Sequence, residues 1–209
     1  YDKFLDAAKW AQDAYGARFI QHLDSSYAGA DDSDKGSPVF MLGDAMIEIL
    51  NYDETYLHTK VPDANYFSYG VKITAANGRT AFLAGDINNY TDGDDNGVGD
   101  EDRLKDVVGP VDLLKLGHHG AAGSNSSDYL CAILKQTNGD DRCVVVQTGD
   151  FAALARRVID ILDEKGARYF SAPEMPGKGE DAFVADLTAD GVWTNAEDAD
   201  PVVREFIVA

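Results

Sequence analysis

Apolar residues recur along this chain with two different spacings, and the change from one to the other predicts an alternation of strands and helices. Short runs that are apolar or alternate with polar residues indicate strands when turn residues bound them. Asn77-Gly78 is the strongest hairpin signal in the sequence, because both residues readily adopt the positive φ angles of a two-residue turn. Gly43-Asp44 and Asp190-Gly191 mark further hairpins. The expected strands span residues 19–23, 38–42, 45–50, 66–75, 80–84, 111–116, 142–148, 167–172, 182–188 and 192–193.

Apolar residues three or four positions apart indicate amphipathic helices. The clearest case places Leu154, Val158 and Ile161 on one face of a segment that ends at Gly166. Helices interleaved with strands favour an α/β architecture, a mixed β-sheet with flanking helices. We expect residues 1–209 to form a single domain. The expected helices span residues 1–15, 100–108, 128–136 and 151–165.

The chain is strongly acidic, with 18 Lys and Arg residues against 37 Asp and Glu residues and a formal net charge of -19. Such a charge repels phosphate backbones and anionic membranes, and no localised basic patch offsets it, so nucleic acid is not expected as a partner. No apolar run reaches the roughly 18 residues that a membrane span requires. The charge favours metal ions and cationic substrates as partners.

Polar side chains directly follow two of the expected buried strands. The run TAFLAGD ends in Asp86, and the run VDLLKLGHH ends in His118 and His119. Loops after the carboxyl ends of strands are where α/β proteins bind their ligands. Carboxylate oxygen and imidazole nitrogen suit Zn²⁺, Mn²⁺ or Fe, so these three residues are candidate catalytic metal ligands. The alternatives are a turn residue after Gly85 and a solvated histidine loop.

The segments FLAGD, DLLKLGHHG and SNSSDYL resemble the C-terminal half of the metallo-β-lactamase fold. The resemblance covers residues 44–193 and is closest to the branch of competence-type DNA-uptake hydrolases and secreted phosphorylcholine esterases. It implies the second half of an αββα sandwich. It also implies that Asp86 bridges two Zn²⁺ ions, with Mn²⁺ or Fe as alternatives, and that His118 is the direct ligand of one metal. His119 would be a further ligand or a donor to the substrate.

The same resemblance implies a metal-dependent hydrolase that acts on phosphoesters or phosphodiesters, of small molecules or of the cell surface. A hydroxide that bridges the metals would attack phosphorus while the metals stabilise the developing oxyanions. Asn88 and Tyr90 follow the Asp86 strand and would line the pocket. The acidic charge weighs against the DNA-processing members of the family. The sequence leaves the cellular compartment open.

One departure from the family pattern changes this expectation. The main metal-binding element of the family, His-x-His-x-Asp-His, is absent, and the other two histidines, His22 and His58, stand alone. Because the chain also begins at Tyr1 without an initiator Met, we expect the C-terminal part of a longer hydrolase, or a family member that has lost the motif. The 209 residues alone should show little or no turnover. An isolated half-sandwich would expose an apolar sheet face, so a homodimer is a further expectation.

The acidic loop Asp92–Asp102 offers an alternative function. Asp92, Asp94, Asn96 and Asp100 match positions of an EF-hand calcium loop, but Arg103 occupies the twelfth position, where a bidentate carboxylate belongs. A solvated turn that leads into a helix capped near Asp100 therefore explains the loop better than a Ca²⁺ site. The alternative hypothesis remains a non-catalytic module that retains the fold and binds metal or calcium for interaction or adhesion.

Cys131 and Cys143 are expected to be free, buried thiols, although a disulfide between them is conceivable. The serines of Ser124–Ser127 are expected to supply hydroxyl groups and an N-cap for the following helix.

Overall fold

The computed structural model of this chain describes residues 2–16, 38–51, 65, 68–89, 100–121, 123–136, 141–147, 154–171 and 185–194. The strand expected at 19–23 and the lone histidines His22 and His58 lie outside these ranges. The N-terminal helix α1 spans Asp2–Tyr15, as its apolar spacing predicts, and Gly16 follows it with φ 67°. None of the helices that the structure describes is long and apolar enough to cross a membrane.

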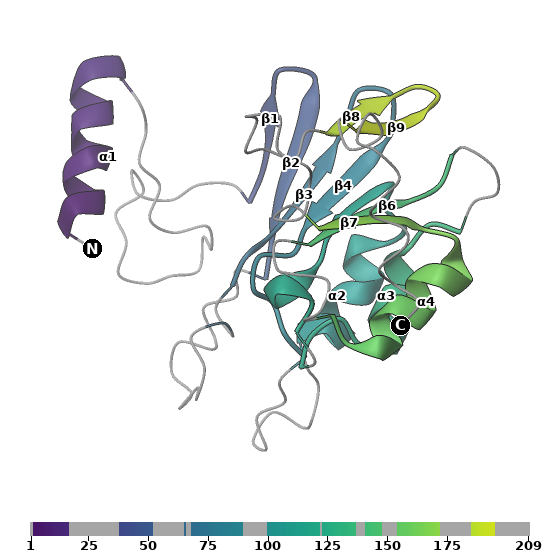
Figure 1. The fold of residues 1–209 in the computed structure, drawn as a ribbon. Helices are drawn as coiled ribbons and strands as arrows, with labels where there is room; N and C mark the ends of the chain where they lie inside the picture. Colours follow the sequence, from purple (N-terminus) through teal and green to yellow (C-terminus); the bar gives the residue numbers. More distant parts are fainter. Residues whose placement is uncertain are drawn as a thin grey trace.

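Seven strands form one mixed sheet in the order of the sequence (Figure 1). Strands β1 to β4 pair antiparallel, and β4 to β7 pair parallel. The α/β class and the mixed sheet are therefore confirmed. The strands are β1 (Val39–Leu42), β2 (Ala45–Leu50), β3 (Gly70–Thr74), β4 (Thr80–Leu83), β5 (Leu113–Lys115), β6 (Val144–Gln147) and β7 (Arg168–Ser171).

Three helices cover one face of the sheet: α2 (Asp100–Val108), α3 (Ser127–Ile133) and α4 (Arg156–Lys165). Figure 1 shows them gathered on one side of the strands. Their apolar residues form one core with those side chains of the central strands that point to this face. The core includes Phe82, Leu114 and Val145 from the sheet and Leu104, Val108, Leu130, Ile133, Val158 and Leu162 from the helices.

The opposite face of the sheet is also apolar but is covered differently. A two-stranded sheet of β8 (Ala185–Thr188) and β9 (Gly191–Thr194) packs on its central part, where Val192 contacts the cluster of Ala81, Leu113 and Val144. The pairing register extends this face across the antiparallel strands to Phe40 at the edge of the sheet. On β1 all four residues are exposed, with Met41 at 62% and Leu42 at 69%.

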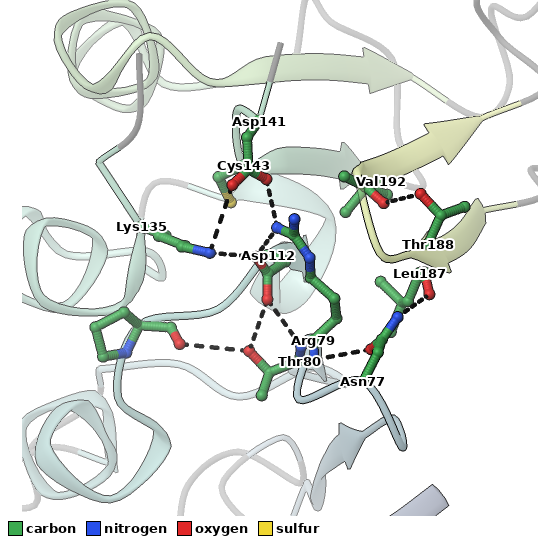
Figure 2. A network of polar contacts seen from close by, with 12 residues as sticks. Asn77, Arg79, Thr80, Asp112, Lys135, Asp141, Cys143, Leu187, Thr188 and Val192 are labelled. Carbon is green, nitrogen blue, oxygen red and sulfur yellow. Dashed lines mark hydrogen bonds and ion pairs between the residues drawn. The ribbon is translucent and has the colours of Figure 1, made fainter. Parts of the chain in front are cut away.

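A network of ion pairs and hydrogen bonds joins the amino ends of the parallel strands to the β8–β9 hairpin (Figure 2). The Asp112 carboxylate accepts hydrogen bonds from Arg79 Nη1 and from Lys135 Nζ, both at 2.8 Å. Arg79 also pairs with Asp141 and donates to the Ala189 carbonyl at 3.1 Å. Burial alone would raise the pKa of the Asp112 carboxyl, but the hydrogen bonds to Lys135, the Thr80 amide and Arg79 outweigh it and lower this pKa.

Several element boundaries differ from those expected from the sequence. Helix α3 ends at Ile133, and α4 begins at Arg156 although the apolar periodicity starts earlier. Cys143 is buried and Cys131 is exposed, and both are free, so the expectation of two buried thiols was wrong for Cys131. The reason is that Cys131 faces away from the sheet, whereas its neighbours Tyr129, Leu130 and Ile133 form the buried face of α3.

Candidate active site

The expected site residues lie at the edge of the sheet where the parallel strands β4 to β7 end, which we call the carboxyl edge. Strands β4 and β5 are neighbours, with Leu83 opposite Lys115. Beyond the strands, the Ala84 amide donates to the Lys115 carbonyl at 3.3 Å, and the His118 amide donates to the Gly85 carbonyl at 3.2 Å. These two bonds hold the turn at Asp86 beside the turn Gly117–Gly120.

One of the two histidines faces Asp86. The distance from His119 Nε2 to Asp86 Oδ1 is 3.9 Å, and both side chains reach solvent, with exposed fractions of 54% and 41%. His118 points elsewhere: its Nε2 lies 3.3 Å from Asn65 Nδ2. An amide nitrogen donates hydrogen bonds, so this contact makes His118 Nε2 an acceptor. The geometry therefore favours His119 over His118 as the partner of Asp86, the reverse of the order implied by the family resemblance.

The turn that carries the two histidines has an unusual backbone. His118 and His119 have φ angles of 45° and 54°, in the left-handed region that side chains other than Gly rarely adopt. Such conformations cost on the order of 1–3 kcal/mol each and persist only where the surroundings impose them. Gly117 is required beside them, since a Cβ there would lie 2.5 Å from the Ile87 carbonyl oxygen. Contacts from other parts of the protein must therefore hold this turn in place.

A buried polar network imposes this turn. The Asn125 side chain accepts a hydrogen bond from the Gly117 amide at 3.0 Å and donates one to the Gly117 carbonyl at 2.9 Å. Glu101 of α2 in turn accepts hydrogen bonds from the Asn125 amide and, at 2.7 Å, from the Ser126 amide. Burial raises the pKa of the Glu101 carboxyl, and these hydrogen bonds oppose that rise. Ser126 is the N-cap residue of α3, within the serine segment that the sequence predicted, but its side chain makes no cap bond.

Three side-chain amide atoms near the carboxyl edge are buried and have no hydrogen-bond partner in the part of the chain that the structure describes. Gln147, the last residue of β6, is 1% exposed, and neither its Oε1 nor its Nε2 is bonded. Asn89, three residues after Asp86, has an unbonded buried Oδ1. Buried polar atoms without partners are uncommon in folded proteins and often belong to functional sites. Sequence analysis did not single out Gln147 or Asn89; it named Asn88, which is buried, and Tyr90, which lies outside the described residues.

Lys115 adds a positive charge to the site. Its Nζ donates a hydrogen bond to the Gly85 carbonyl at 2.5 Å and lies 3.9 Å from Asp86 Oδ1. Desolvation by burial lowers the pKa of Lys115, and the charge of Asp86 opposes this. An ammonium group, a carboxylate and an imidazole therefore meet at the ends of β4 and β5.

The pair Asp86 and His119 fits a metal ion in part. Ligand atoms about 2.0–2.2 Å from a tetrahedral Zn²⁺ lie roughly 3.3–3.6 Å apart, so a small side-chain rotation would let both residues contact one ion. Among the residues that the structure describes, no three His, Cys, Asp or Glu side chains gather into a group that could hold a metal. The pair therefore supplies two ligands, and further ligands would have to come from groups outside the described residues.

The calcium hypothesis gains no support from the described end of the acidic loop. Residues 92–99 lie outside the described ranges, and Asp100 begins α2, as the sequence predicted. Asp100 is buried and forms an ion pair with Arg103. Arg103, at the twelfth loop position, therefore pairs with the Asp100 carboxylate, which a calcium ion would need as a ligand.

Comparison with known proteins does not assign this chain to a family. No protein-family model matches the sequence, and no curated protein resembles it at a significant level. The geometry of the carboxyl edge is therefore the basis for a functional assignment.

Proposed function

We propose that this protein is a metal-dependent hydrolase of the metallo-β-lactamase type that acts on phosphoester or phosphodiester substrates when its metal site is complete. The observation that carries the proposal is the pair Asp86 and His119, which come from adjacent parallel strands and lie 3.9 Å apart at the carboxyl edge. The costly left-handed backbone at His118 and His119 supports it, since backbone strain of this kind gathers at functional sites.

The two faces of the sheet support the proposed fold family. In an αββα sandwich each sheet carries helices on one face and packs against a second sheet on the other. Here α2, α3 and α4 cover one face, and among the described residues β8 and β9 pack on the central part of the other, apolar face. Phe40, Leu42 and Leu83 on that face remain at least 38% exposed. A second apolar layer would bury them, as sheet-on-sheet packing does.

The residues of the site can be given roles on this proposal. Asp86 would hold one or two metal ions through its carboxylate, and His119 would be the imidazole ligand. Zn²⁺ is the metal that this donor set suits best, with Mn²⁺ or Fe as alternatives, and a bound metal supplies a hydroxide nucleophile and a Lewis acid at neutral pH. His118 would stay bonded to Asn65 and contact the substrate, while Asn125 and Glu101 would hold the turn.

A metal-binding experiment tests the proposal directly. Zinc uptake by the chain is measured by equilibrium dialysis and elemental analysis, for the parent protein and for Asp86→Ala and His119→Ala. Each variant should bind zinc about ten- to a hundredfold more weakly or worse. Losing an outer-shell contact lowers metal affinity by about this factor, and losing one of few direct ligands should lower it at least as much. Asp106→Ala, which removes an exposed carboxylate of α2, is the matched control and should bind as the parent does. Equal zinc uptake by all four proteins would refute the site.

A further inference from the structure

We infer that Lys115 binds an oxyanion of the substrate and thereby makes the site selective for anionic substrates such as phosphomonoesters. The inference rests on the proposed hydrolase site and names a specificity-determining residue for it. Three observations carry it: the position of Lys115 at the carboxyl edge, its incomplete set of hydrogen bonds within the described residues, and its partial burial.

The sheet places Lys115 at the centre of the candidate site. It is the last residue of β5, between β4 and β6, and lies opposite Leu83 and Val146 in the two pairings. Side chains alternate between the faces of a sheet. Leu114 points into the helix-covered core, so Lys115 points to the same face as Leu113, away from the helices. Its ammonium group then extends past the end of β4 to Gly85 and Asp86.

The hydrogen bonds of Lys115 leave part of its donor capacity unused. A lysine ammonium has three N–H donors. One of them donates to the Gly85 carbonyl at 2.5 Å. The carboxylate of Asp86, at 3.9 Å, is too far away for a hydrogen bond. Among the residues that the structure describes, the other two donors have no hydrogen-bond partner, so they remain for a ligand.

Burial makes those unused donors significant. The Lys115 side chain is only 17% exposed, so water replaces the missing partners poorly. A buried cation normally keeps its charge because it is fully paired and hydrogen-bonded. A phosphoryl oxygen placed against Nζ would supply both an opposite charge and hydrogen-bond acceptors. In a chain of net charge -19, such a local cation is also what lets an anionic substrate approach the site.

The position of the Lys115 ammonium group suits a substrate that contacts both this group and a metal ion held by Asp86 and His119. Asp86 Oδ1 lies 3.9 Å from both His119 Nε2 and Lys115 Nζ. An ion held by Asp86 and His119 would therefore have Lys115 as a close neighbour. One oxygen of a phosphoryl group could then contact the metal while a second oxygen accepts from Lys115.

Lys115 could instead serve only to hold the Gly85–Asp86 turn, and the two roles predict different results. A residue that only positions Asp86 would change zinc affinity when it is removed. A residue that binds the substrate would change anion affinity and leave zinc affinity unchanged or increased, because removing a neighbouring positive charge favours a cation. Anion binding and zinc binding therefore have to be measured on the same variants.

Titration with inorganic phosphate tests the inference. Phosphate binding to the full chain is followed by NMR chemical shifts and calorimetry, with and without Zn²⁺, for the parent protein, Lys115→Met and Lys115→Arg. Lys115→Met should weaken phosphate binding about ten- to a hundredfold, as expected for hydrogen bonds from a charged donor, and Lys115→Arg should retain most of it. Lys72→Met removes the same charge from β3, which is separated from β5 by β4, and should bind phosphate as the parent does.

Each result decides between the role in substrate binding and the alternatives. No phosphate binding by the parent protein, or equal binding by Lys115→Met, overturns the inference even if zinc binding is normal. A loss of zinc binding in Lys115→Met with unchanged phosphate binding assigns Lys115 to positioning and also overturns it. Loss of phosphate binding with normal zinc binding supports it. If phosphate binds through Lys115 but zinc does not bind through Asp86 and His119, the proposed hydrolase fails and the anion site remains. Circular dichroism and thermal unfolding of each variant show that it is folded.

Discussion

Asn125 holds the histidine turn, and its removal should destabilise the protein by an amount that the structure allows to be estimated. The side chain is fully buried and bonds both the amide and the carbonyl of Gly117. Without it, two buried backbone groups lose their partners, each at a cost of about 1–3 kcal/mol. Asn125 also has a φ angle of 60°, which Gly adopts without strain. Asn125→Gly therefore removes the hydrogen bonds without adding backbone strain and should lower the free energy of unfolding by about 2–6 kcal/mol.

A second substitution separates the hydrogen bonds from the backbone conformation. Asn125→Ala removes the same bonds but keeps a Cβ in the left-handed region, which costs about 1–2 kcal/mol more than Gly at this position. The expected order of stability is therefore parent, then Asn125→Gly, then Asn125→Ala. Urea unfolding followed by circular dichroism measures it. NMR signals of the His118 and His119 rings should shift in both variants, because the turn that carries them is released.

Two outcomes would refute the role assigned to Asn125. If Asn125→Gly unfolds within about 1 kcal/mol of the parent protein, the bonds to Gly117 contribute no more than an ordinary hydrogen bond. If the histidine signals stay unchanged while stability falls, Asn125 stabilises the fold without holding the site.

Two further predictions concern the amino ends of the strands and the exposed sheet. The folded pKa of Asp112 is below its ordinary value of 3.8, so its stabilising contribution is present above that pH and is lost as the pH falls through the folded pKa. Asp112→Asn should therefore lower the free energy of unfolding by about 1–3 kcal/mol at neutral pH and make it less dependent on pH in the acid range. Parallel pH profiles of this free energy for variant and parent would contradict the prediction. The exposed apolar strand β1 predicts a homodimer, and Met41→Lys with Leu42→Lys should shift it to monomer in light scattering. A parent protein that is monomeric at its highest soluble concentration would be the contrary result.

Local features of the sequence predicted much of the fold. Hairpins at Gly43 and Gly78 follow from the positive φ angles of those residues, 61° and 81°. Helix α2 runs from Asp100 to Val108 as expected, because Gly109 and Pro110 end it. These signals act within a few residues, so the chain encodes them without reference to the rest of the fold. The segment of α4 shows the limit of such signals: its apolar spacing begins before Arg156, where the helix starts.

The site shows the same division between local and tertiary information. The sequence alone placed Asp86, His118 and His119 after two buried strands, since strand endings are readable from local patterns. Which histidine faces Asp86 was decided by the left-handed turn, and that turn depends on Asn125 and Glu101, which belong to other segments. The partial burial of Lys115 and the full burial of Gln147 likewise follow from strand neighbours and helix packing. Contacts between residues distant in the chain are set by how elements pack, and periodicity carries no information about that packing.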